Sequence, residues 1–291
     1  MSFDPTEQVY EDEATGWQAG LYTDIRETLR APIVNSIWRT QLYHAPDVLR
    51  YVWGQLKPVF ETRAFAEFSV AYRDTLLSAV DDGLPSYDPA AVGLEPAAFT
   101  ELRGQLATFD AVSPRLAVLF VLMDRRLHGE PVGSEFEGSR AATAPFPDWL
   151  DADRGRPPTM LPQDRARERL PEALTGDFGD MVPSIYRCLA QWPAYLEQSW
   201  SDLEPVLDSE AYERAREEAF ELVEQHLDRL AHEPAVDPET LERHGVDRET
   251  VEGLQGLFGT FRAGGETVLP HLCLHATAVG AEGERAGLAG P

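Results

Sequence analysis

Residues 36–65 read SIWRTQLYHAPDVLRYVWGQLKPVFETRAF, and residues 184–212 read SIYRCLAQWPAYLEQSWSDLEPVLDSEAY. Both stretches open with Ser-Ile-aromatic-Arg and continue with the spacing P-x6-W-x4-P-x6-aromatic, at an offset of 147 residues between the first prolines. A second match without a gap pairs residues 93–109 with residues 245–261, at an offset of 152. A period this long is unlike the 20–50-residue units of solenoids. The sequence therefore indicates two globular halves derived from one duplicated unit.

The hydrophobic pattern within each half is that of helices. Apolar side chains recur every three or four residues after each initial proline, which predicts helices over residues 46–57 and 193–204 with proline in the first turn. Residues 210–231 form the most strongly amphipathic stretch, which Ser209 is expected to cap. Further helices are predicted over residues 23–30, 96–109, 112–127, 248–261 and 266–277.

No run of alternating β-branched residues and no Asn-Gly hairpin signal interrupts this helical pattern. The predicted fold class is therefore all-α, with two tandem helical repeats that form an intramolecular pseudo-dimer about a pseudo-two-fold axis. A ligand site would then lie in the crevice between the repeats.

The chain divides by composition into five segments. Residues 134–172 are crowded with Pro, Gly, Arg and Asp, which predicts a linker that wraps from one half to the other, and the last residues, GAEGERAGLAGP, are expected to bury nothing. The predicted organisation is an acidic N-terminal segment at 1–20, repeat 1 at 21–133, the linker at 134–172, repeat 2 at 173–278 and a flexible tail at 279–291.

The charge balance is strongly acidic. The chain carries 50 Asp and Glu against 25 Lys and Arg, a formal net charge of −25, and Lys57 is its single lysine. This composition is typical of proteins from salt-accumulating halophiles, in which high ionic strength screens the repulsion among carboxylates. It argues against nucleic acid and anionic membrane surfaces as partners, because both require clustered basic residues. Homo-oligomers are left open.

Targeting and redox signals favour a cytoplasmic protein. Cys188 and Cys273 build no disulfide framework. The N-terminus, MSFDPTEQVYEDE, has no basic start followed by an apolar stretch, so no signal peptide is expected. The longest apolar run, residues 116–123, is too short to span a bilayer.

Two groups of polar residues could bind a ligand. Arg39 and Arg187 occupy the same place in the two repeats and could bind a carboxylate through the guanidinium fork; the favoured alternative is that each pairs with an acidic neighbour. His271 and His275 would share one helix face and could hold a metal ion together with one carboxylate or Cys188. Without an H-E-x-x-H or Cys-x-x-Cys motif, two core histidines are the favoured interpretation, and neither a metal nor a cofactor is expected.

Other candidates are weaker. Asp177 and Asp180 precede the second repeat and could be catalytic carboxylates, although two aspartates prove little in so acidic a chain. Residues 113–115, Ser-Pro-Arg, could form a polar pocket wall or a capped turn between two helices. His226 and His232 are expected to be solvated on or just past the charged helix.

The order of short motifs resembles that of a known family. Residues 22–32 read YTDIRETLRAP, residues 131–133 read PVG and residues 189–193 read LAQWP. This dispersed pattern, from about residue 21 to 278, resembles the group I 2-haloacid dehalogenases of the DehI type. The resemblance implies an all-helical pseudo-dimer with the pocket between its repeats. It also implies an aspartate that activates water for direct displacement of halide from the α-carbon, without a covalent ester intermediate.

The site positions implied by the resemblance have changed in this chain. Counted back from residues 189–193, the family's catalytic aspartate falls on Ile185, which cannot accept a proton. The family's aromatic pocket residues fall on Ile33 and Ser36, and its Asn and Tyr before the central helix fall on Ser113 and Leu116. The predicted pocket is lined by Ile33, Ser36, Arg39, Ser113, Leu116, Ser184, Ile185 and Arg187.

Three functions follow from these observations. The first is a divergent DehI-like protein whose pocket between the repeats takes another small, carboxylate-like molecule. The second is an active 2-haloacid dehalogenase that uses a displaced carboxylate, Asp177 or Asp180, and the third is a non-catalytic scaffold or partner-binding protein. We favour them in this order because the scaffold residues persist while the matched site residues have changed.

Overall fold

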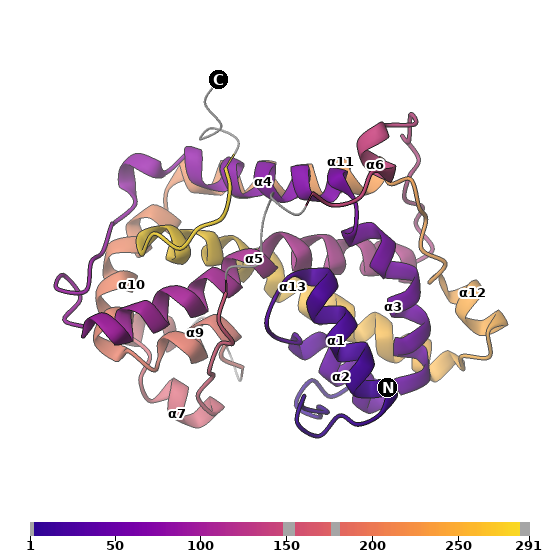
Figure 1. Cartoon of the computed structure of the whole chain (residues 1–291), viewed down its shortest axis with the longest axis horizontal. Coiled ribbons are helices and arrows are strands. Elements are labelled where there is room, and N and C mark those ends of the chain that lie inside the picture. Colours follow the sequence, from indigo (N-terminus) through magenta and orange to yellow (C-terminus); the bar gives the residue numbers. More distant parts are fainter. Residues whose placement is uncertain (1–2, 148–154, 176–180, 286–291) are drawn as a thin grey trace.

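The computed structural model describes residues 3–147, 155–175 and 181–285, and its described residues form helices joined by loops, with a single isolated β-bridge. All-α is therefore the fold class, as predicted (Figure 1). In chain order the helices are α1 (Trp17–Leu29), α2 (Ser36–His44), α3 (Pro46–Phe60), α4 (Arg63–Ser78), η1 (Asp81–Gly83), α5 (Pro96–Leu127), α6 (Arg140–Thr143), α7 (Gln163–Arg167), α8 (Glu172–Thr175), α9 (Ser184–Leu189), α10 (Pro193–Leu207), α11 (Glu210–Asp228), α12 (Pro238–Arg243) and α13 (Arg248–Ala278).

Local signals in the sequence place several helix starts. Pro46 and Pro193 are the first residues of α3 and α10, where a missing N–H does no harm. Ser209 caps α11 as predicted, its hydroxyl accepting a hydrogen bond from the Tyr212 N–H at 3.1 Å. Thr62 caps α4 in the same way, accepting from the Phe65 N–H at 3.1 Å, at the position 147 residues earlier.

Two long helices pass side by side through the centre of the molecule (Figure 1). The sequence predicted a break in each, at residues 110–111 and 262–265, but α5 and α13 are each continuous, with Pro114 and Pro270 inside them. Proline in a helix removes one backbone hydrogen bond and can kink the helix without ending it. Here the two helices pack against each other over much of their length, and this burial keeps each of them continuous.

The order of helices repeats along the chain. The run α2, α3, α4, α5 is followed by α9, α10, α11 and α13, with α12 as an addition. One aromatic contact recurs as well: the rings of Trp38 and Trp53 meet edge to face at 5.4 Å and 80°, and those of Tyr186 and Trp200 at 6.2 Å and 80°. These matches support the predicted duplication. The halves also cross over, because α5 packs against α9 and α13 packs against α2.

The C-terminal residues are packed more firmly than their composition predicts. The Gly283 N–H donates to Asp110 Oδ2 at 2.8 Å, and Arg73 Nη1 donates to the Glu284 carbonyl oxygen at 2.8 Å. The Arg285 guanidinium lies 2.7 Å from Asp81 Oδ2. Residues 281–285 are thus tied to α4, α5 and η1. These residues are not loose as expected, because their backbone supplies hydrogen bonds to the buried Arg73–Asp110 ion pair. Composition alone does not reveal such contacts between distant parts of the chain.

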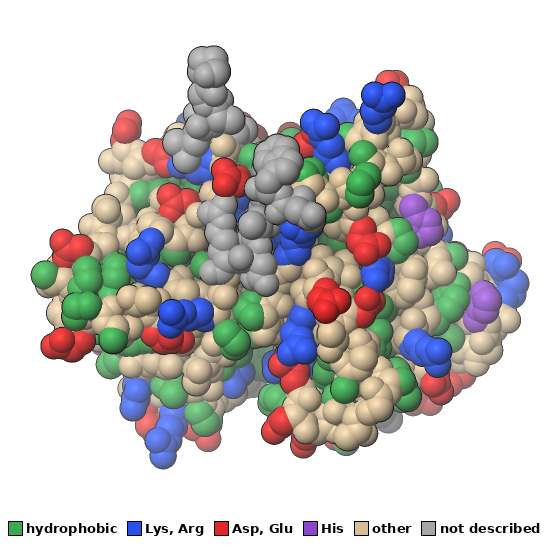
Figure 2. Space-filling model, in the orientation of Figure 1, with side chains coloured by type: hydrophobic (Ala, Val, Ile, Leu, Met, Phe, Trp, Pro, Cys, Tyr) green, Lys and Arg blue, Asp and Glu red, His purple; other side chains and the backbone are tan. Residues whose placement is uncertain are grey.

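Acidic and basic side chains are interspersed over the face shown in Figure 2. Among the described helices, α5 alone is long and apolar enough to cross a membrane, by length and composition. Its apolar window is wholly buried inside the protein, however, as in the core helix of a globular domain.

Candidate functional site

The predicted site is built on the first turns of α2 and α9. Ser36 and Ser184 begin these helices and are half-buried. The isoleucines that follow point inward: Ile37 is fully buried, and Ile185 is 1% exposed. Ile185 thus places a hydrocarbon side chain in the core at the position where the resemblance puts the water-activating aspartate.

The arginines that end the Ser-Ile-aromatic-Arg element, Arg39 and Arg187, are both half-buried. Burial lowers the pKa of Arg187, nearby Tyr10 opposes this, and the positive charge of Arg39 lowers the pKa further. Burial also lowers the pKa of Arg39, opposed by Tyr10, Glu11 and Tyr22. The two repeats therefore bring two like charges together around Tyr10.

The partners of these guanidinium groups differ from the ion pairs favoured from sequence. Arg39 lies over the ring of Tyr10, 4.9 Å from its centroid, and its buried Nε has no hydrogen-bond partner among the described residues. Arg187 Nε donates to the carbonyl oxygen of Leu161 at 2.8 Å. Among the residues that the structure describes, neither arginine forms an ion pair within 4.0 Å. The carboxylate of Glu11 opposes the lowering of the Arg39 pKa, but it accepts a hydrogen bond from the Val34 N–H.

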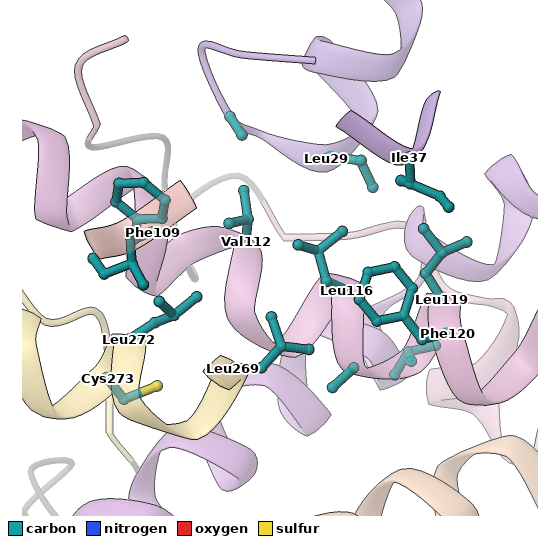
Figure 3. Close-up of a cluster of buried hydrophobic side chains, with 14 of the residues drawn as sticks. Leu29, Ile37, Phe109, Val112, Leu116, Leu119, Phe120, Leu269, Leu272 and Cys273 are labelled. Atoms are coloured by element: carbon teal, nitrogen blue, oxygen red, sulfur yellow. The ribbon is translucent and has the colours of Figure 1, made fainter. Parts of the chain in front are cut away.

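The remaining predicted pocket residues are distributed between the site and the core. Ile33 is half-buried in the turn before α2. Ser113 is fully buried in the middle of α5, where its hydroxyl donates to the Leu269 carbonyl oxygen of α13 at 2.8 Å. Leu116, 8% exposed, belongs to the apolar cluster that also contains Leu29 and Ile37 (Figure 3). Ser113 and Leu116 therefore join α5 to its neighbours and lie within helix, not in a turn.

The linker supplies part of the site that sequence reasoning missed. Its backbone passes over the start of α5, where the Thr159 N–H donates to Gln105 Oε1 at 3.0 Å. Gln191, at the end of α9, donates to the Thr159 carbonyl oxygen at 2.7 Å. Tyr10 and Leu161 complete the surroundings of the arginine pair from two loops. No local motif marks such residues, because their role depends on contacts between distant segments.

The histidine pair of α13 lies in the core. Tyr186 Oη and His271 Nδ1 are 2.9 Å apart, and burial lowers the pKa of His271 to about 4. Burial lowers the pKa of His275 to about 3 and raises that of the Cys188 thiol to about 12. Across residues 3–147, 155–175 and 181–285, no three His, Cys, Asp or Glu side chains are grouped so that they could hold a metal ion. Asp177 and Asp180 lie outside the described residues.

Sequence reasoning also misplaced His226. It was expected to be solvated on α11, but its Nε2 is buried without a hydrogen-bond partner among the described residues, and burial lowers its pKa to about 4. The cause is the packing of α11 against α4, which places the imidazole against the ring of Phe68 at 4.8 Å.

Comparisons with known proteins agree with the resemblance. A family model described as "Halocarboxylic acid dehydrogenase DehI" matches residues 32–175. A configuration-inverting 2-haloacid dehalogenase from Pseudomonas sp. (strain 113) is 28% identical over 274 residues, covering 87% of this chain and 83% of that protein. An (R)-2-haloacid dehalogenase from Pseudomonas putida is 23% identical over 210 residues, covering 67% of each.

Solved structures agree in fold. A D-2-haloacid dehalogenase mutant in complex with D-2-CPA superposes with a TM-score of 0.76 at 19% identity, covering 93% of this chain and 94% of that chain. The D-2-haloacid dehalogenase in complex with L-LA gives a TM-score of 0.76 at 19% identity and covers 93% and 95%. At this identity the likeness establishes the shared helical architecture. The family match, the curated relatives and the shared fold together support the DehI-type family of 2-haloacid dehalogenases as the family of this chain.

Proposed function

We propose that this protein is a divergent DehI-type member that binds a small carboxylate between Arg39 and Arg187 and does not hydrolyse 2-haloacids. One observation carries the proposal: the guanidinium of half-buried Arg39 lies over the Tyr10 ring at 4.9 Å, and its charge lowers the pKa of Arg187, the half-buried arginine at the corresponding position. Neither has an ion-pair partner among the described residues, in a chain with twice as many acidic as basic side chains. An anion between them would relieve this repulsion.

The chemistry of the guanidinium group favours a carboxylate as that anion. Its planar fork of N–H donors matches the two oxygens of a carboxylate, and Arg39 still has a buried Nε to satisfy. The ring of Tyr10 lies against Arg39 and would limit the ligand to a small acid. The relatives are named for 2-haloacids, which are small carboxylic acids, so recognition of this class could persist after the chemistry has changed.

The absence of a base at position 185 argues against haloacid hydrolysis. Ile185 is 1% exposed and cannot take a proton from water. Asp110, the carboxylate nearest in sequence to Ser113, is held by Arg73 Nε at 2.9 Å and by the Gly283 N–H at 2.8 Å. A carboxylate bound in this way is not available to activate water.

Binding can be measured directly by calorimetry with lactate and with both enantiomers of 2-chloropropionate. We expect Arg39→Gln and Arg187→Gln each to weaken binding by about tenfold or more, because each removes a charge-assisted hydrogen bond. Arg214→Gln removes an exposed arginine from α11 and serves as the matched control. Equal affinity in all three variants would refute the arginine site, and no binding of any of these acids would favour the scaffold alternative.

Turnover is tested by halide release from the same two enantiomers. We expect release to stay at the uncatalysed rate in the unaltered protein. Ile185→Asp should restore little, since a carboxyl group at this buried position would have a raised pKa and stay protonated. Stereoinverting turnover by the unaltered protein would instead support an active dehalogenase. Loss of that turnover in Asp177→Asn or Asp180→Asn would then identify the displaced base.

A further inference from the structure

We propose that a cavity between α4, α6 and α11 is a second ligand site, which takes an apolar monocarboxylate such as a medium-chain fatty acid. The cavity has a volume of about 610 Å³. Sites for small organic molecules typically measure roughly 300–1,000 Å³. It lies along α4 and α11, whereas the arginine pair lies on α2 and α9, so this site is independent of the carboxylate site proposed above.

The walls of the cavity suit a hydrocarbon body. They are formed by the end of α3, one face of α4, the short helix α6 and the last turns of α11. Burial of hydrocarbon against such walls is favourable in proportion to the area removed from water. The apolar side chains include Val59, Phe68, Ala71, Ala142, Leu222 and Leu230.

His226 provides a polar group within this apolar cavity. Its ring stacks on Phe68 at 4.8 Å with an interplanar angle of 25° and meets Phe65 edge to face at 5.9 Å. Because burial lowers its pKa to about 4, the imidazole is neutral at pH 7 and offers one donor and one acceptor nitrogen. Its buried Nε2 has no hydrogen-bond partner in the described part of the chain, and such an unsatisfied group costs free energy.

The charges at the rim select the sign of the ligand. Glu61 and Glu67 line the cavity, but each already has a cationic neighbour on its own helix or the preceding one: Lys57 lies 3.6 Å from Glu61, and Arg63 lies 2.7 Å from Glu67. Arg229 also lines the cavity, is exposed, and forms no ion pair with any residue that the structure describes. The rim therefore offers one guanidinium, that of Arg229, without an acidic partner among the described residues, which favours a carboxylate head group over an amine.

The duplicated half of the molecule has no equivalent of this site. At the 147-residue offset, His226 corresponds to Ala79, and Phe68 corresponds to Ala215. Neither the imidazole nor the aromatic ring of this cavity has a counterpart at the corresponding position of the other half. One ligand per chain is expected.

Calorimetric titration with octanoate, octanol and octylamine tests the ligand class. We expect octanoate to bind with one site per chain, octanol to bind about tenfold more weakly because it lacks the charge-assisted contact to Arg229, and octylamine to show no binding. Octylamine binding as tightly as octanoate would overturn the assignment of the head group. Failure of octanoate to bind would overturn the site itself.

Three variants locate the binding. Arg229→Gln should weaken octanoate by about tenfold or more, while Arg248→Gln, an exposed arginine of α13 paired with Glu252, should leave the affinity unchanged. Ala71→Leu should abolish binding by filling the cavity, and Ala142→Leu provides a second filling variant if the first does not fold.

The remaining readouts separate this site from the arginine pair. Octanoate should shift the imidazole resonances of His226 in the unaltered protein. Arg39→Gln should not change octanoate affinity. Octanoate affinity lost in Arg39→Gln and kept in both filling variants would refute the cavity as the site.

Discussion

At the scale of single residues, the two tryptophans of the repeated motif differ in how their indole N–H is satisfied. Trp53 is 3% exposed, and its Nε1 donates at 2.7 Å to Asp24, which also binds Lys57 at 2.6 Å. Trp200 is 8% exposed, and its buried Nε1 has no hydrogen-bond partner among the described residues. The same sequence position therefore carries a hydrogen-bond network in one half and a purely apolar contact in the other.

This difference predicts unequal effects of truncation. Trp53→Ala and Trp200→Ala should each lower the free energy of unfolding by roughly 3–5 kcal/mol, through lost burial and the cavity left behind. The Phe variants isolate the hydrogen bond: Trp53→Phe should be more destabilising than Trp200→Phe, because only the first removes a hydrogen bond, the one that the indole N–H donates to Asp24. Urea unfolding followed by circular dichroism measures all four. Losses below about 1 kcal/mol at both Ala variants would mean that neither ring supports the core.

Three buried histidines predict how stability depends on pH. Burial lowers the pKa of His226 and His271 to about 4 and that of His275 to about 3, from 6.5 in an exposed histidine. The unfolded chain therefore binds more protons than the folded chain below pH 6.5. Stability is fully present above that pH and is lost as the pH falls toward 4, by up to about 1.4 kcal/mol per pH unit for each histidine.

His275→Leu provides the matched test of this pH dependence. Both ring nitrogens of His275 are buried without hydrogen-bond partners in the described residues, so an apolar side chain of similar size should fold well. Urea unfolding between pH 7 and pH 4.5 should show a slope reduced by about one proton relative to the unaltered protein. His128→Gln, at an exposed histidine, should leave the slope unchanged. An unchanged slope in His275→Leu would show that this side chain is protonated when folded.

At the scale of helices, the start signals of α4 and α11 correspond across the repeat. Thr62→Ala and Ser209→Ala each remove a side-chain oxygen that accepts a hydrogen bond from the first turn. Each should lower the free energy of unfolding by about 1 kcal/mol. Ser201→Ala, at an exposed position inside α10, should change it by much less. If the two Ala variants lower the free energy of unfolding by amounts that differ by more than the error of the measurement, tertiary packing and not the cap fixes one of the two helix starts.

At this scale the sequence could predict those features of a helix that residues within the same turn determine. Pro46, Pro193 and Ser209 act within one turn, so the starts of their helices were predictable. The continuity of α5 and α13 depends on packing between the two helices, whereas the sequence predicted breaks at residues 110–111 and 262–265.

The site was less predictable than the fold for the same reason. Arg39 and Arg187 were identified because the repeat aligns them, but the neighbours that decide their partners, Tyr10 and Leu161, come from distant loops. His226 was misplaced because its burial depends on α4. Contacts between segments far apart in the chain leave no spacing pattern to read.

At the scale of the whole molecule, the two halves meet in two different ways. Along α5 and α13 the interface is apolar and continuous, as in the core of a single domain. At the first turns of α2 and α9 two positive charges come together, and between α4, α6 and α11 a cavity remains. The centre of the molecule is thus a continuous apolar interface, and the buried charges and the cavity lie away from it.

The acidic surface predicts the response of the molecule to salt. The formal net charge of −25 opposes compaction, and most ion pairs lie at the surface, where each contributes little. The ion pair between Arg73 and Asp110 is buried, so added salt should leave it nearly unaffected. Screening should therefore weaken repulsion more than it weakens attraction, and Tm should rise steeply from dilute buffer to molar KCl.

A charge-reduced variant separates screening from general effects of salt on protein hydration. Glu217, Glu218 and Glu221 are exposed on α11, and none of them forms an ion pair with a described residue. Replacing all three with Gln should raise Tm in dilute buffer and flatten its dependence on KCl, since part of the repulsion has already been removed. The same rise with KCl in both proteins would attribute the effect to hydration. A Tm that does not change with KCl in the unaltered protein would refute the interpretation of this surface as an adaptation to high salt.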